Sequence, residues 1–243
     1  MSKETLLIHG WDPQFYNNNV GENATDDIAW RHRPDLIRLL SKKYSLNYFN
    51  LPGFCGVPEP DKEEFNVEDF TDSFADWIEK SKEKPKVIIG YSFGGVVALD
   101  YKARYDNSIP TILISPALYR GESAKSRFAH LAKNVIPEGI SEPLKKYYQY
   151  LFSRYYRNGT PFLRESYDLI VRRDMTPELK KIDPRSLLLI YGSEDSVTPW
   201  KQVENDAATL GLQYGVIEKG GHNIGQTHPE EIAALIDKFL RTK

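Results

Sequence analysis

The sequence has a single cysteine, no long apolar run and no excess of either charge. Cys55 alone cannot form an intrachain disulfide, so the fold has to be held by packing rather than by covalent links. The apolar runs have the length of β-strands, and none is long enough to span a bilayer. The 32 lysines and arginines nearly balance the 34 aspartates and glutamates and are spread along the chain, so we expect neither nucleic-acid binding nor membrane binding.

Targeting signals, repeats and metal-ligand patterns are missing as well. The first residues, MSKETLLIHG, enter an apolar strand at once and lack the layout of a signal peptide, so we expect a cytoplasmic protein. The five histidines have no ligand spacing such as H-E-x-x-H, and no metal or cofactor is predicted. A chain of 243 residues without an internal repeat suits one α/β domain with a large core.

What the sequence does contain is a regular alternation of short apolar runs with amphipathic, helical stretches. The runs are nearly all apolar or rich in β-branched residues, which is typical of strands covered on both faces. This alternation predicts right-handed crossovers and a doubly wound, mostly parallel sheet of about six strands. The predicted strands are Thr5–Ile8, Tyr48–Leu51, Val87–Ile89, Thr111–Ile114, Leu187–Tyr191 and Tyr214–Glu218.

The alternation is interrupted at residues 117–186, a stretch of about seventy residues without a good strand. Ser141, Thr160 and Thr176 are each followed closely by proline, a pattern that marks helix starts. We therefore predict a helical cap over 117–186, inserted into a core formed by residues 1–116 and 187–243.

The strongest motif is GYSFG at residues 90–94, placed directly after one predicted strand and directly before a helical run. A sharp strand-to-helix turn needs flanking residues without bulk, and the two glycines meet this need, so that the hydroxyl of Ser92 projects from the turn. We predict Ser92 as a nucleophile. The amide of Phe93, at the start of the following helix, is a candidate donor to an oxyanion.

A second motif, His9-Gly10-Trp11, ends the first predicted strand. Gly10 permits a turn there, and the amide of Trp11 would be the second oxyanion donor. We expect substrate to bind at these backbones, at Gly10, Trp11, Tyr91 and Phe93. His9 alone is weak evidence, since it could simply be a hydrogen-bonded structural histidine.

Two further loops follow later strands. Residues 192–199 have the sequence GSEDSVTP after the fifth predicted strand, and residues 220–223 have the sequence GGHN after the sixth. Together with NLPGF at 50–54, this order of motifs resembles the α/β-hydrolase family over residues 5–116 and 187–241. The resemblance implies Asp195, rather than Glu194, as the acid and His222 as the base.

Each of these two roles has an alternative. Asp195 could be a loop carboxylate that caps the helix starting near Pro199. His222 competes with three other histidines, of which His32 and His130 lie in helical stretches and His228 precedes the last helix. His222 is favoured because it lies in a glycine-rich loop after the final strand.

A serine with a histidine base and a carboxylate partner predicts hydrolysis through an acyl-serine intermediate. Our preferred substrate is a small carboxylic ester or lactone, and a homodimer is possible. A prolyl aminopeptidase, a thioesterase or a C–C bond hydrolase would use the same three residues. A ligand receptor of the same fold is also left open, because an intact triad does not exclude one. Multiple turnover would favour the enzyme.

Overall fold

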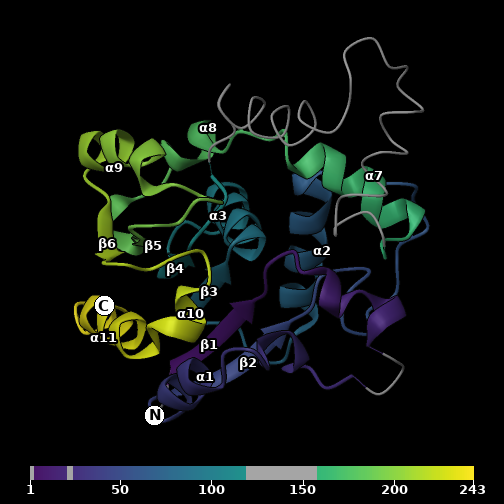
Figure 1. Cartoon of the computed structure of the whole chain (residues 1–243), viewed down its shortest axis with the longest axis horizontal. Helices are drawn as coiled ribbons and strands as arrows, with labels where there is room; N and C mark the ends of the chain where they lie inside the picture. The colour runs from purple at the N-terminus through teal and green to yellow at the C-terminus, as the bar shows by residue number, and fades with distance from the viewer. Residues whose placement is uncertain (1–2, 21–23, 119–157) are drawn as a thin grey trace.

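The computed structural model describes residues 3–20, 24–118 and 158–243 (Figure 1). Its centre is a six-stranded, all-parallel sheet with the strand order β2-β1-β3-β4-β5-β6. The predicted doubly wound sheet is therefore confirmed. The strands are β1 (Lys3–Ile8), β2 (Tyr44–Phe49), β3 (Val87–Tyr91), β4 (Thr111–Ile114), β5 (Leu187–Gly192) and β6 (Gln213–Ile217).

The prediction was least accurate for the second strand, which was expected at Tyr48–Leu51 and lies at Tyr44–Phe49. β2 is an edge strand that is half-buried over most of its length, and its sequence YSLNYF alternates apolar and polar residues. Only the central strands β3, β4 and β5 are buried at every residue. A continuous apolar run is therefore a good signal for the middle of this sheet and a poor one for its edge.

Helices cover both faces of the sheet, with α1 (Pro34–Ser41) beside α11 (Pro229–Leu240) and α2 (Val67–Lys80) beside α3 (Phe93–Arg104) (Figure 1). None of the helices in the described ranges is long and apolar enough to cross a membrane. The remaining helices are α7 (Pro161–Ile170), α8 (Thr176–Leu179), α9 (Glu204–Leu210) and α10 (Ile224–Thr227), and the 3₁₀ segments are Pro13–Phe15, Asn17–Asn19, Ile28–Trp30, Pro184–Ser186 and Trp200–Gln202.

The start of α2 illustrates how local sequence fixes these helices. The side chain of Asn66 accepts a hydrogen bond from the amide of Asp69, and the Asp69 carboxylate accepts one from the amide of Asn66. This reciprocal capping box satisfies two amides that the helix itself leaves unpaired. From this start the helix buries Phe70, Phe74 and Ile78 against the core.

The described part of the interruption at 117–186 contains α7 and α8. The predicted start at Thr160 is confirmed, because its hydroxyl accepts a hydrogen bond from the amide of Leu163 at 3.2 Å. A helix also starts at Thr176, with Met175 in the capping position. The start predicted at Ser141 lies outside the described residues, and the division into core and cap stays a prediction.

Candidate active site

Ser92 lies between β3 and α3, in a backbone conformation that only a sharp turn imposes. Its φ of 52° and ψ of −114° lie in a region that residues with side chains seldom adopt. The flanking glycines make the turn possible. A Cβ on Gly94 would overlap the carbonyl oxygens of Ile8 and His9 at the end of β1, and one on Gly90 would overlap the backbone of Gly94. The sequence motif therefore corresponds to a crowded, strained turn.

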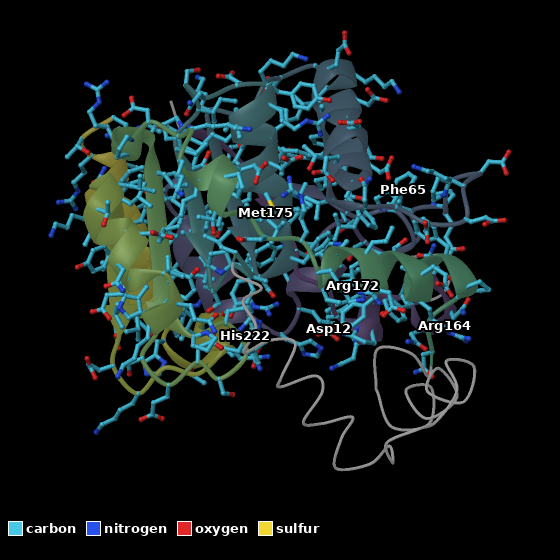
Figure 2. The ribbon with its side chains drawn as sticks, turned by 90° about the horizontal axis from the view of Figure 1, so that it is seen from above. Asp12, Phe65, Arg164, Arg172, Met175 and His222 are labelled. Atoms are coloured by element: carbon cyan, nitrogen blue, oxygen red, sulfur yellow. The ribbon has the colours of Figure 1, made fainter. Side chains whose placement is uncertain are left out.

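The structure brings the side chains of Ser92, His222 and Asp195 together from loops that follow β3, β6 and β5. His222 Nε2 is 3.1 Å from Ser92 Oγ, and His222 Nδ1 is 2.9 Å from Asp195 Oδ2. Because all strands are parallel, these loops meet at the carboxyl edge of the sheet. In the view from above, His222 lies on the α10 side of the molecule, whereas Phe65 and Arg164 lie on the α7 side (Figure 2).

The Asp195 carboxylate is buried and uses both of its oxygens. Oδ1 accepts hydrogen bonds from the amides of Val197 and Thr198, each at 2.8 Å, and Oδ2 faces His222 and the Thr198 hydroxyl. Burial alone would raise the pKa of this carboxyl. The hydrogen bond and charge of His222, together with the hydrogen bonds of Thr198, outweigh burial and hold the pKa below its usual value. Asp195 is therefore ionised and only accepts hydrogen bonds.

The competing histidines have other surroundings. His32 contacts the side chain of Gln14, and His228 contacts the hydroxyl of Thr227, both at the surface, while His130 lies outside the described residues. His9 is buried. Its Nδ1 lies 2.8 Å from the carbonyl oxygen of Gly10, and its Nε2 accepts a hydrogen bond from the amide of Leu51 at 3.1 Å. Its pKa is lowered to about 4 because burial disfavours the charged ring. The structural interpretation of His9 therefore holds.

The loop after β1 lies directly against the turn of Ser92. A Cβ placed on Gly10 would be 3.1 Å from Ser92 Cβ. The rings of Trp11 and Phe93 meet edge to face, with centroids 5.5 Å apart, and the Trp11 indole donates a hydrogen bond to the Tyr16 hydroxyl at 2.6 Å. Within the described part of the chain, the amides of Trp11 and Phe93 donate to no carbonyl. Their role in binding an oxyanion stays a prediction.

Tyr91 was predicted as a substrate-binding residue, and its side chain is buried beneath the loop of His222. Its hydroxyl donates a hydrogen bond to the carbonyl oxygen of His222 at 2.8 Å and accepts one from the amide of Gly225 at 3.3 Å. The guanidinium of Arg33 lies 4.0 Å from the centre of the phenol ring. Any contact of Tyr91 with substrate would therefore involve its backbone, while its side chain supports the histidine loop.

Sequence reasoning missed two residues that support the site, Thr198 and Arg33. It also missed that the Tyr91 hydroxyl supports the loop of His222. No spacing in the sequence links these residues to the triad. They lie next to it because separate elements converge at one edge of the sheet. Thr198 and Tyr91 do lie within the sequence motifs, but the motifs do not show where their side chains point.

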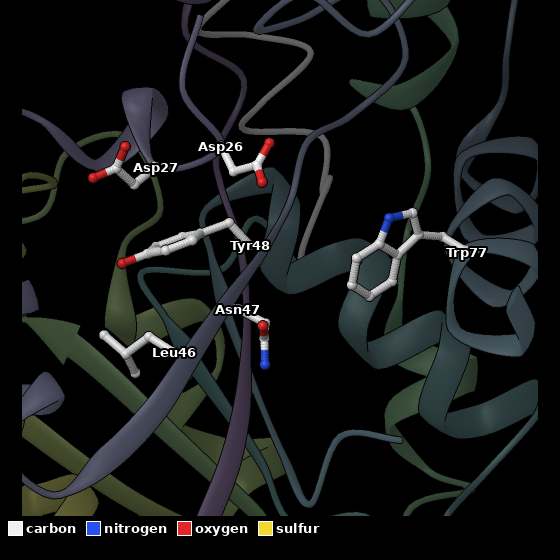
Figure 3. A pocket seen from close by; sticks show the side chains of 6 residues that line it. All are labelled: Asp26, Asp27, Leu46, Asn47, Tyr48 and Trp77. Carbon is white, nitrogen blue, oxygen red and sulfur yellow. The ribbon is translucent and has the colours of Figure 1, made fainter. Parts of the chain in front are cut away.

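A pocket of about 330 Å³ lies elsewhere, along the edge strand β2 (Figure 3). None of its lining residues belongs to the triad or to the Gly10–Trp11 segment beside Ser92, so we assign it no part in the chemistry at Ser92. The lining residues are Asp26, Asp27, Leu46, Asn47, Tyr48 and Trp77.

The alpha/beta hydrolase family profile matches residues 5–235, and the chain belongs to this family, as predicted. It is similar to the pimeloyl-[acyl-carrier protein] methyl ester esterase of Neisseria meningitidis serogroup C, with 27% identity over 98% of this chain and 93% of that protein.

Solved structures share the fold. The esterase EaEST from Exiguobacterium antarcticum superposes with a TM-score of 0.69 at 17% identity, covering 99% of this chain and 92% of that one. The serine hydrolase CarC, involved in carbazole degradation, has a TM-score of 0.67 at 21% identity, covering 100% of this chain and 92% of that one. The prediction of a carboxylic ester hydrolase agrees with the hydrolase family and with the methyl ester esterase of Neisseria meningitidis.

Proposed function

We propose that this protein is a serine esterase in which Ser92 is the nucleophile, His222 the base and Asp195 the acid partner of the base. The observation that carries the proposal is the unbroken chain of side-chain contacts from Ser92 Oγ through both nitrogens of His222 to Asp195 Oδ2. A serine hydroxyl is a poor nucleophile at neutral pH unless a base lies within hydrogen-bond reach, and this chain supplies one.

The reaction follows from this order of groups. His222 Nε2 takes the proton of Ser92 Oγ while the oxygen attacks the ester carbonyl carbon, and it then gives that proton to the departing alcohol. Water then passes a proton to the same nitrogen while its oxygen attacks the acyl carbon. When the bond from the acyl carbon to Ser92 Oγ breaks, His222 returns that proton to Oγ, which releases the free acid and restores Ser92. Asp195 fixes the tautomer with hydrogen on Nδ1 and stabilises the imidazolium that forms twice in the cycle.

The amides of Trp11 and Phe93 are the proposed donors to the tetrahedral oxyanion. Two observations support this: the close approach of Gly10 to Ser92, and the lack of a carbonyl acceptor for either amide among the described residues. We also propose that the Trp11 and Phe93 rings, which lie against each other, form an apolar wall for the substrate.

For the substrate we propose a carboxylic ester with a small alcohol group, such as a methyl ester, or a small lactone. The methyl ester esterases among the relatives support the first choice. A panel of substrates distinguishes a free acyl group from one attached to a carrier protein. The same panel separates the ester from a thioester, a prolyl amide or a C–C bond.

The first experiment is labelling with a fluorophosphonate probe, followed by turnover of short p-nitrophenyl esters. We expect one label per chain on Ser92, none on Ser92→Ala, and a loss of turnover of about six orders of magnitude in Ser92→Ala. Asp195→Asn should lower turnover by about three to four orders of magnitude. The adjacent, exposed Glu194 provides the matched control, and Glu194→Gln should behave like the wild type.

Wild-type turnover in Ser92→Ala would refute the nucleophile, and a large loss in Glu194→Gln with none in Asp195→Asn would move the acid by one position. The panel then compares free methyl esters, methyl esters attached to an acyl-carrier protein, lactones, thioesters, prolyl amides and substrates with a cleavable C–C bond, all at equal concentration. Repeated turnover supports the enzyme. A single turnover with retained ligand on every compound would support the receptor instead.

A further inference from the structure

Thr198 lies in the loop of the acid, three residues after Asp195, and it is buried. Its hydroxyl oxygen is 2.7 Å from Asp195 Oδ2, 3.3 Å from the carbonyl oxygen of Ser115 at the end of β4, and 3.3 Å from His222 Nδ1. It therefore touches both members of the acid–base pair and the neighbouring strand end.

A threonine hydroxyl has one hydrogen to donate. Asp195 Oδ2 is both the nearer acceptor and the charged one, so the hydrogen points to it rather than to Ser115. His222 Nδ1 is excluded as an acceptor, because the tautomer that accepts from Ser92 at Nε2 carries its hydrogen on Nδ1. That N–H instead faces two oxygens, Asp195 Oδ2 at 2.9 Å and Thr198 Oγ1 at 3.3 Å.

The two oxygens of Asp195 are held in different ways. Oδ1 is held by the amides of Val197 and Thr198, which are present whatever the side chain at position 198. Oδ2, the oxygen that faces His222, has one other donor in the described structure, the Thr198 hydroxyl. A buried carboxylate needs such donors to remain charged, and this hydroxyl is the donor that a single substitution removes.

We propose that Thr198 is a positioning residue of the triad, whose hydroxyl fixes the orientation and charge of the Asp195 oxygen that faces His222. The inference rests on the proposed function, because it assumes that Asp195 acts through His222. It predicts that loss of the hydroxyl weakens catalysis through Asp195 and leaves substrate binding unchanged.

The test compares two variants that divide the side chain into its parts. Thr198→Val keeps the shape and removes the hydroxyl, whereas Thr198→Ser keeps the hydroxyl and removes the methyl group. We expect kcat of Thr198→Val on a p-nitrophenyl ester to fall about 10- to 100-fold, the effect of losing one hydrogen bond to a charged acceptor. KM should stay within about twofold, and Thr198→Ser should retain kcat to within about threefold.

A double-mutant cycle gives the second readout. In the Asp195→Asn background, Thr198→Val should lower kcat by less than about threefold, because the interaction it removes is already lost. Three outcomes would overturn the role of Thr198. The first is a wild-type kcat in Thr198→Val, and the second is a loss of kcat in Thr198→Ser as large as that in Thr198→Val. The third is a loss of kcat on adding Thr198→Val to Asp195→Asn that is as large as in the wild-type background. If Thr198→Val fails to fold, Thr198→Ala takes its place in both comparisons with Thr198→Ser.

The two proposals fail in different ways. If Asp195→Asn itself keeps wild-type turnover, the acid of the proposed function is wrong. If Asp195→Asn loses turnover while Thr198→Val does not, the triad stands and only the inference about Thr198 is lost.

Discussion

A buried neutral histidine makes the stability of this protein sensitive to mild acid. His9 accepts a hydrogen bond from Leu51 at Nε2 and lies with Nδ1 against the carbonyl oxygen of Gly10. Both contacts require the neutral ring with its hydrogen on Nδ1. Protonation at Nε2 would break the bond with Leu51 and place a charge in the core beside the ring of Phe54.

The magnitude follows from the shift in pKa, from 6.5 to about 4, which burial causes. Below pH 6.5 His9 is protonated in the unfolded chain but stays neutral in the folded protein. Its contribution to the free energy of unfolding is therefore fully present above that pH and is lost as the pH falls towards 4. The full shift corresponds to about 3 kcal/mol. Between pH 7 and pH 5 the free energy of unfolding should fall by about 2 kcal/mol through His9 alone.

The assay is urea unfolding at pH 7, 6 and 5 for the wild type and for His9→Gln, whose amide oxygen can still accept from Leu51. We expect His9→Gln to be less stable than the wild type at pH 7 and the difference in the free energy of unfolding to narrow by about 2 kcal/mol at pH 5. The control is His32→Gln, which removes a partly buried histidine near the surface and leaves His9 in place, so the contribution of His9 should remain. A constant gap between wild type and His9→Gln over this range would refute the reasoning.

Two further substitutions test the turn of Ser92 and the loop of His222. Gly94→Ala should lower the free energy of unfolding in urea by about 3 kcal/mol or more, because the new Cβ would overlap the carbonyl oxygens at the end of β1. Gly221→Ala is its control: the space around the new Cβ is open, and the free energy of unfolding should stay within about 0.5 kcal/mol of the wild type. Tyr91→Phe removes the hydroxyl that is hydrogen-bonded to the His222 loop. We expect kcat to fall about fivefold and the free energy of unfolding to fall by about 1 kcal/mol. An unchanged kcat would contradict the role of this hydroxyl in supporting His222.

The predictability of the fold followed burial. β3, β4 and β5 were predicted within two residues, because strands covered on both faces must be apolar throughout. The predicted start of β2 was four residues too late. In this edge strand apolar and polar residues alternate, and the most apolar part of the segment reaches past the end of the strand to Leu51. Helix starts at prolines were accurate where they can be compared, since a proline in the first turn is a local signal. Thr160 also caps its helix with its side chain, whereas the helix at Thr176 has no side-chain cap.

The site was predictable to the extent that its signals were local. The glycines on either side of Ser92 are visible in five letters of sequence, although the carbonyl oxygens that Gly94 has to accommodate belong to the distant end of β1. Asp195 and His222 were found through the order of strands, since parallel strands bring successive loops to one edge. The contacts of Thr198 and of the Tyr91 hydroxyl could not be predicted, because they depend on side-chain directions between segments up to 131 residues apart.

Asp195 also shows why a structural and a catalytic interpretation need not compete. As a loop carboxylate, it was expected to cap the helix starting near Pro199. The segment Trp200–Gln202 has no side-chain cap, and Oδ1 instead accepts hydrogen bonds from the amides of Val197 and Thr198 just before it. As a catalytic acid, it was expected to reach the base, and Oδ2 lies against His222. The two sets of contacts use different oxygens: the loop amides hold Oδ1, and Oδ2 faces the Thr198 hydroxyl and His222. The loop contacts of Asp195 are therefore compatible with its proposed role as the partner of His222, because they leave Oδ2 facing that ring.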